Sequence, residues 1–221
     1  MDRIPNHVDM NPQKDVFDCL TVVSQKTTQP AMPEGSQEGT LRGLHRLRQG
    51  AIFDPKPRVQ LLGNGAILGE ILAASELLER DFDVFSDVWS VTSYTELWRE
   101  GMELERWNRL HPTATPRTAF VQRQLAGSRG PVIAATDEMH TVPDQIRPFI
   151  TDRRFVMLGT DGFGPSDTRQ ALPARSEVTR HQIVVAALQA LADDGLLQAQ
   201  EAADAIVRFG MDPEARPAAV A

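Results

Sequence analysis

Cysteine is almost absent from this sequence, since Cys19 is the only one among 221 residues. A single thiol cannot form an internal disulfide, and no two of the five histidines have a spacing typical of metal ligands, which argues against a zinc site. Residues 1–14 contain charges and two prolines but no apolar segment of the kind found in secretory signals. We therefore expect a cytoplasmic protein with a mobile N-terminal leader.

Long hydrophobic runs are missing as well. Hydrophobic residues make up 41% of the chain, but no run approaches the roughly 18 residues that a membrane span requires. The 23 basic residues are outnumbered by 30 acidic ones, and the net charge of −7 argues against phosphate-driven binding to nucleic acid. The densest basic group has helical spacing, and we interpret it as a solvated helix face rather than an anion site; it consists of Arg42, His45, Arg46 and Arg48. We expect neither a membrane nor a nucleic acid as partner.

Two enzyme motifs are incomplete. Gly63-Asn64-Gly65 begins a dinucleotide-binding pattern that needs a third glycine at position 68, where the chain has Leu68. Ser166 and Ser176 lie in no GxSxG elbow, which argues against a serine hydrolase. We interpret residues 63–65 as a tight turn, and a small nucleotide-dependent enzyme is the weakest of the functions considered.

The sequence does contain a regular alternation of strand and helix patterns. Strands are predicted at 59–62, 84–91, 131–135 and 155–158, with a further short strand within 178–184. Helices are predicted at 38–48, 66–80, 95–110 with an interruption at Gly101, 143–149, 181–192 and 198–209. This order predicts an α/β fold of three αβα layers around a mainly parallel sheet. Right-handed crossovers then place the turns at Gly63, Ser93, Thr136 and Gly159 along one edge.

Polar residues gather in the turns at this edge. The stretch LGTDGFGPSDTR (158–169) is a strand that runs into a glycine-rich turn. The edge also carries side chains suited to acid–base chemistry: Asp137, Glu138, His140 and Asp161. An exposed loop imidazole explains His140 equally well, and we favour a role for Asp161 in capping local backbone amides, because Asp-Gly is a typical turn pair. The aromatic side chains are predicted to be core and interface contacts; they are Trp89, Tyr94, Trp98 and Trp107.

Seven segments resemble one enzyme family, in the same order along the chain. They are QPAMPEGSQEG (29–39), VQLLGNGAIL (59–68), DVWSVTSYTEL (87–97), ERWNRLHP (105–112), DQIRPF (144–149), LGTDGFGPSDTR (158–169) and HQIVVAALQALADDG (181–195). Together they resemble the C-terminal domain of the homodimeric-type pyruvate dehydrogenase, the thiamine-diphosphate-dependent decarboxylating component of the pyruvate dehydrogenase complex. The resemblance implies a transketolase-type C-terminal domain, whose mainly parallel sheet has about five strands with one antiparallel edge strand.

The resemblance also implies a division of the chain. Residues 1–14 are the leader, and residues 15–55 are an arm that corresponds to the tail of the preceding, pyrimidine-binding domain together with a linker. Residues 56–213 are the transketolase C-terminal-like domain, and residues 214–221 are a tail.

In the family that the chain resembles, thiamine diphosphate and Mg²⁺ are held by other domains through a GDG motif with downstream asparagines. Here Thr160-Asp161-Gly162 departs from that motif, and no asparagine follows Asn108. The resemblance therefore implies that this chain alone holds no catalytic, cofactor-binding or metal-binding residues. Partner chains would supply the thiamine diphosphate and the Mg²⁺.

The glycine turn corresponds to a family landmark that reads GFGRSD, in which an arginine stands where this chain has Pro165. Loss of that guanidinium removes a bidentate donor from the turn. We expect the glycine turn, together with the turn that contains His140, to face a partner. The candidate interface residues are His140, Asp161, Phe163, Pro165, Asp167 and Arg169.

Two functional hypotheses follow. In the first, the chain is the C-terminal domain or subunit of a thiamine-dependent 2-oxo acid dehydrogenase, which oxidatively decarboxylates pyruvate and passes the acyl group to lipoyl. It then needs partner chains with thiamine-binding domains and belongs to a pyruvate dehydrogenase complex. In the second, it is a non-catalytic interaction module, or a relic, that forms a homodimer.

Overall fold

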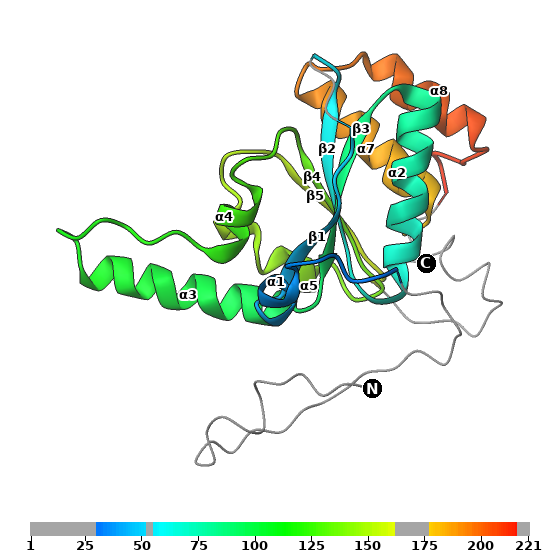
Figure 1. Ribbon diagram of the computed structural model, residues 1–221. Helices are drawn as coiled ribbons and strands as arrows, with labels where there is room; N and C mark the ends of the chain where they lie inside the picture. Colours follow the sequence, from blue (N-terminus) through cyan, green and yellow to red (C-terminus); the bar gives the residue numbers. More distant parts are fainter. Residues whose placement is uncertain (1–29, 52–54, 162–176, 216–221) are drawn as a thin grey trace. The chain divides into compact units, whose positions relative to one another are not determined.

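The computed structural model describes residues 30–51, 55–161 and 177–215 (Figure 1). All the elements below belong to the unit formed by Met32–Ala221. No helix within the described ranges is long and apolar enough to cross a membrane.

The centre of the unit is a sheet of five strands in the order β1-β3-β2-β4-β5. The strands are β1 (Leu44–Arg48), β2 (Arg58–Gly63), β3 (Phe85–Val91), β4 (Val132–Ala135) and β5 (Phe155–Leu158). β1 pairs antiparallel with β3, and the other pairs are parallel. The mainly parallel sheet with one antiparallel edge strand is therefore confirmed.

Helices cover both faces of the sheet (Figure 1). They are α1 (Gln37–Leu41), α2 (Leu68–Phe82), α3 (Tyr94–Leu110), α4 (Phe120–Leu125), α5 (Thr141–Asp144), α7 (Arg180–Asp193) and α8 (Ala199–Arg208), with 3-10 turns η1 (Gly65–Ile67) and η2 (Arg147–Phe149). Neighbouring strand residues point to opposite faces, so Leu61 joins the core under α2 and α7 while Leu62 joins the core under α3 and α4.

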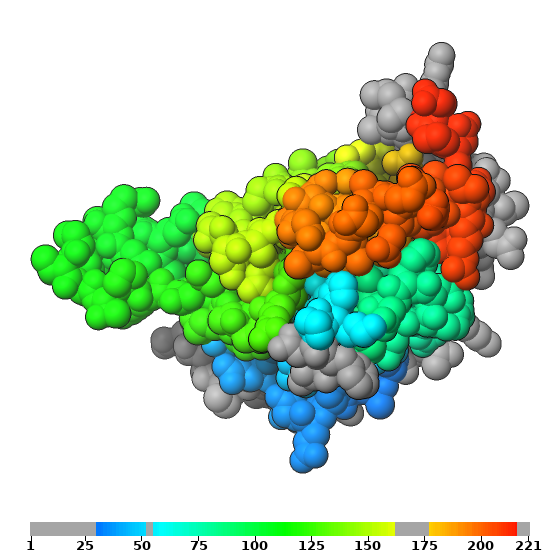
Figure 2. Space-filling view, turned by 90° about the horizontal axis from the view of Figure 1, so that it is seen from above, coloured from blue at the N-terminus to red at the C-terminus, as the bar shows by residue number. Residues whose placement is uncertain are grey.

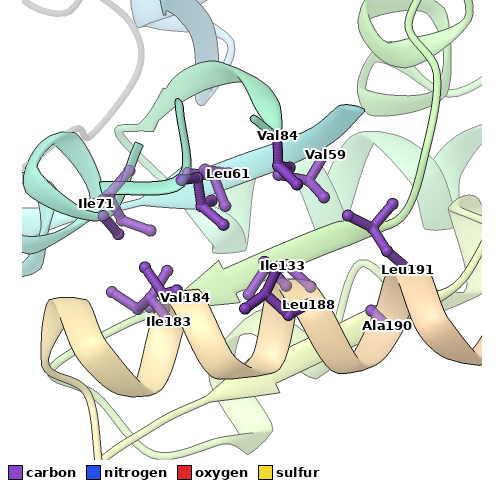
Figure 3. Packing of buried hydrophobic residues seen from close by; sticks show 14 of the residues in the cluster. Val59, Leu61, Ile71, Val84, Ile133, Ile183, Val184, Leu188, Ala190 and Leu191 are labelled. Atoms are coloured by element: carbon purple, nitrogen blue, oxygen red, sulfur yellow. The ribbon is translucent and has the colours of Figure 1, made fainter. Parts of the chain in front are cut away.

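The larger of the two cores lies between α7 and the sheet (Figure 3). Ile183, Val184 and Leu188 recur at helical spacing on α7 and are fully buried. They belong to the same cluster as Leu61 and Ile133 from the central strands, which are also fully buried. Each such side chain contributes about 1.5–3 kcal/mol when it is removed from water. The sequence pattern that predicted a helix at 181–192 is thus the pattern of this buried face.

The helix predicted at 38–48 is wrong beyond Leu41. The chain turns at Gly43, where φ is +98°, and continues as the edge strand β1. Leu44 and Leu47 lie three residues apart, a spacing that fits a helix, but in the strand they join the cores on opposite faces of the sheet. Pairing with β3 has overridden the local preference. The basic group at 42–48 is accordingly not a helix face.

Two further predictions are wrong in detail. No strand forms within 178–184, because α7 starts at Arg180 behind a capping box in which Thr179 and Gln182 exchange side-chain and backbone hydrogen bonds. α3 runs without interruption through Gly101. The short helix α4 was not predicted from the sequence.

A hydrogen-bond network is buried inside the sheet. Gln60 of β2 is fully buried, and its Nε2 donates to Asp87 Oδ2 of β3 at 3.0 Å and to the Arg129 carbonyl at 3.0 Å. Its Oε1 accepts from Trp89 Nε1 at 2.8 Å. Asp87 Oδ1 accepts from Arg58 Nη1 at 2.8 Å and from the Gly50 amide at 3.1 Å. The network therefore satisfies a buried amide and a nearly buried carboxylate with good geometry.

Gly101 stands at a close approach between α3 and η2, and its substitution tests that contact. A Cβ at this position would lie 2.3 Å from Phe149 Cε2, so Gly101→Ala must displace the ring. We expect the free energy of unfolding to fall by about 1–3 kcal/mol, as for other overpacked sites.

Gly69 of α2 provides the matched control, because a Cβ there meets nothing within 4 Å. Gly69→Ala should raise the free energy of unfolding by about 0.5–1 kcal/mol, the usual helix preference of alanine. Urea denaturation of both variants measures the difference. A stabilising Gly101→Ala would contradict the packing of α3 against Phe149.

Candidate functional site at the carboxyl edge of the sheet

The turns that follow β4 and β5 meet at the carboxyl edge of the sheet. The Thr160 amide donates to the Glu138 carbonyl at 2.9 Å, and Thr160 Oγ1 donates to the Asp137 carbonyl at 2.6 Å. Within the first turn, the Glu138 amide donates to Thr136 Oγ1 at 3.0 Å. The turn at Gly159 therefore lies beside the turn at Thr136, as the right-handed crossovers predict.

Asp161 binds His140 through both carboxylate oxygens. Oδ1 accepts from the His140 backbone amide at 3.0 Å, and Oδ2 lies 2.6 Å from His140 Nδ1. His140 directly precedes α5, so Asp161 caps the start of that helix from the neighbouring turn. Asp161 accepts from a backbone amide, but this amide belongs to His140, 21 positions away, and not to the local Asp-Gly turn for which the capping role was predicted. The imidazole is oriented by a carboxylate and 39% exposed.

Gly159 is the point at which the two turns come closest. A Cβ at this position would lie 2.8 Å from the His140 amide nitrogen and 2.9 Å from the Glu138 carbonyl oxygen. Such distances are shorter than van der Waals contact, so the approach of the two turns requires glycine.

A second contact at this edge joins the segments that follow β2 and β4, and Tyr94 begins the helix that follows β3. Asn64 Nδ2 donates to Glu138 Oε2 at 3.0 Å. Tyr94, at the start of α3, is 3% exposed, and its hydroxyl has no hydrogen-bond partner within the described residues. Burial and the nearby Glu138 carboxylate raise the pKa of Tyr94 above its usual value. The phenol therefore stays protonated near neutral pH.

The structure places only part of the candidate interface. It brings His140 and Asp161 into direct contact. The other four candidates, Phe163, Pro165, Asp167 and Arg169, lie outside the described residues. The contribution of Asn64 to the edge was missed, because an Asn-Gly pair in a turn gives no sign of a contact with Glu138, 74 positions along the chain.

The described residues at this edge do not fit a magnesium–diphosphate group. Both oxygens of Asp161 are occupied by His140, and the Glu138 carboxylate accepts from Asn64. In residues 30–51, 55–161 and 177–215, no group of three or more His, Cys, Asp or Glu side chains is arranged to hold a metal ion. The arrangement provides an oriented imidazole, two polar turns and a protonated phenol.

Residues 43–179 match the family described as the transketolase-like TK C-terminal domain, and the chain belongs to this family. Its β1 strand and the carboxyl-edge turns up to Asp161 lie inside the matched range. Among solved structures, the transketolase of Campylobacter jejuni aligns over 73% of this chain and 20% of its own, with a TM-score of 0.48 and 15% identity.

The curated relatives are named pyruvate dehydrogenase E1 component. The Pseudomonas aeruginosa protein is 47% identical over 204 residues, which are 92% of this chain and 23% of that protein. The Cupriavidus necator protein is 47% identical over 201 residues, and the Escherichia coli K12 protein is 42% identical over 202 residues. The resemblance seen in the sequence segments is confirmed, and the chain spans less than a quarter of the length of these relatives.

The unpartnered hydroxyl of Tyr94 leads to a stability prediction. Because a buried hydroxyl without a partner is a net cost, Tyr94→Phe should leave the free energy of unfolding unchanged or raise it by up to about 1 kcal/mol. Thermal and urea unfolding measure the change.

The neighbouring Ser93 is the control, since its Oγ caps α3 by accepting from the Glu96 amide at 3.1 Å. Ser93→Ala should lower the free energy of unfolding by about 1 kcal/mol. If Tyr94→Phe lowered the free energy of unfolding as much as Ser93→Ala does, the hydroxyl would have a partner in solution and the prediction would be wrong.

Proposed function

We propose that the chain serves as the C-terminal domain or subunit of a pyruvate dehydrogenase-like, thiamine-dependent 2-oxo acid dehydrogenase. The complete assembly would oxidatively decarboxylate pyruvate and pass the acyl group to lipoyl. The observation that carries the proposal is the similarity to the Pseudomonas aeruginosa pyruvate dehydrogenase E1 component. The match covers 92% of this chain but only 23% of that protein.

The proposal assigns the cofactor chemistry to partner chains. Thiamine diphosphate and Mg²⁺ would be held there, and the bound thiamine would supply the carbanion that attacks the 2-oxo group. The coverage of the relatives supports this assignment, because more than three quarters of their length lies outside the match to this chain and is available for cofactor-binding domains. The present chain would contribute a rigid sheet and the surface on which the partner rests.

Within this assignment, His140 and Asp161 hold the carboxyl edge in one shape. Asp161 links the turn after β5 to the start of α5, and Thr160 links the same turn to the turn after β4. We place the partner interface at this edge, together with Phe163, Pro165, Asp167 and Arg169. The competing function is a non-catalytic module that forms a homodimer, and it predicts no assembly with thiamine-binding chains.

Reconstitution tests the proposal. The full chain is mixed with a chain that carries the thiamine-binding domains of the same family, together with thiamine diphosphate and Mg²⁺, and pyruvate-dependent reduction of an electron acceptor is followed. We expect the rate to rise with the amount of added chain until a fixed ratio is reached. Omission of pyruvate and replacement of the chain by an equal mass of albumin are the controls. A rate no higher than that of the partner alone would count against the proposal.

A further inference from the structure

The distal half of α3 extends beyond the helices that cover the sheet, as Figure 1 and Figure 2 show. We call residues 102–118 the α3 arm; it comprises the end of α3 and the segment that returns toward α4. The buried residues of α3 are Tyr94, Leu97 and Gly101, all in its first half. Along the arm, Leu104, Trp107 and Asn108 are partly covered, and the other residues are exposed. The arm therefore contributes little to either core of its own chain.

The base of the arm is fixed to the rest of the unit by Glu100. Its carboxylate accepts from Arg42 Nη2 at 2.9 Å and from the Phe120 amide at 2.8 Å. Arg123 of α4 adds a longer contact of 3.4 Å to the same carboxylate. These contacts link α3 to the segments next to α1 and at the start of α4, so they set the direction in which the arm leaves the sheet.

The tip of the arm is ordered by its own side chains. The Trp107 ring is stacked on His111 with centroids 4.3 Å apart, and the Arg117 guanidinium lies 3.7 Å from the Trp107 ring centroid. Asn108 Nδ2 donates to the Arg117 carbonyl at 2.9 Å, while the Arg117 amide donates to Asn108 Oδ1 at 2.8 Å. These contacts explain the ERWNRLHP segment structurally. They hold an exposed arm in one conformation, which lowers the entropy cost of binding.

One side of α3 carries an exposed surface, which we call the α3 face: Trp98, Met102, Glu105 and Arg109. These residues lie three or four positions apart and therefore share a side of the helix. Trp98 is 39% and Met102 45% exposed. Tryptophan is enriched at the energetic centres of interfaces, and methionine adapts to irregular partners. A pair of large apolar side chains followed by charges matches the core and rim of a protein interface.

A second copy of the chain does not fit the α3 face well. Two copies of α3 could pair antiparallel with Glu105 opposite Arg109 of the second copy. This pairing is centred on position 107, so Trp98 would lie opposite Pro116 and not opposite Met102. An antiparallel pairing centred on position 100 brings Trp98 opposite Met102. It leaves Glu105 and Arg109 without an opposite charge on the second copy. Parallel pairing in register places Glu105 beside Glu105 and Arg109 beside Arg109 of the second copy, and this repulsion destabilises the dimer.

More than three quarters of the length of the matched relatives lies outside the similarity to this chain. α3 begins at Tyr94, three residues after the end of β3, so the helix starts from the carboxyl edge assigned to the partner. We propose that the α3 face docks on the chain that carries the thiamine-binding domains, with Trp98 and Met102 in an apolar depression and Glu105 and Arg109 on its polar rim. This inference rests on the proposed function and adds the surface through which it operates.

The test measures the affinity of the full chain for that thiamine-binding chain by isothermal titration calorimetry. Trp98→Ala combined with Met102→Ala should weaken binding on the order of 10- to 100-fold, as expected for loss of an aromatic contact at the centre of an interface. Met102→Lys is a second variant that keeps Trp98 and places a charge in the apolar centre, and it should weaken binding by a similar factor. Urea midpoints verify that both variants are folded.

Two matched controls remove exposed apolar side chains elsewhere. Leu110→Ala lies about 110° around the axis of α3 from the centre of the α3 face, and Val207→Ala lies on α8; these residues are 55% and 80% exposed. Both should bind within about threefold of the unchanged chain, since contacts outside an interface contribute little. Equal affinity of the α3-face variants and the controls would overturn the docking surface and leave the proposed function standing. No binding by the unchanged chain would overturn the proposed function and with it this inference.

Sedimentation velocity of the full chain alone distinguishes the occupant. A dimer that the Trp98/Met102 variant converts to a monomer would assign the α3 face to a second copy and overturn the proposal. A sedimentation coefficient unchanged by the substitutions agrees with a heterologous partner.

Discussion

The buried side chain of Gln60 constrains the whole sheet. An amide in the centre of a sheet is costly unless its donors and acceptor are satisfied, and here they are satisfied by Asp87, Trp89 and the carbonyl of Arg129. A one-residue slip of β2 would move Gln60 to the other face and leave the Asp87 carboxylate without this donor. The network thus favours a single register of β2 against β3, and Arg58 and the Gly50 amide extend it toward the edge strand.

A fixed register has consequences at the opposite end of the strands. The register fixes where β2, β4 and β5 end relative to one another. The turns after these strands are therefore close enough for Asn64 and Thr160 to hydrogen-bond Glu138. The same edge is the starting point of α3, whose base is held by Glu100. Hydrogen bonds therefore connect the core, the carboxyl edge and the base of the arm into one support. Such a support is suited to a domain whose chemistry lies on a partner, because binding then costs little reordering.

The sequence predicted the elements whose pattern reflects their burial. The continuous apolar run at 131–135 and the helical spacing at 181–192 became β4 and α7. β1 was mistaken for a helix because its leucines also fit a helical spacing, and only pairing with β3 decides between the two. At the site, the local Asp-Gly pair suggested that Asp161 caps a nearby amide, whereas the amide that it binds belongs to His140, 21 positions away. The contact between Asn64 and Glu138 depends on the packing of strands far apart in the sequence, which no local pattern reports.

Hydrogen–deuterium exchange on the full chain, with and without the thiamine-binding chain, tests most directly whether this domain acts by resting on a partner. Exposed helices and turns exchange through local opening, which a bound partner suppresses. The account predicts slower exchange in residues 94–118 and in the turns at 136–141 and 158–161 when the partner is added, and unchanged exchange in α8. Unchanged exchange in all of these segments at saturating partner would contradict it.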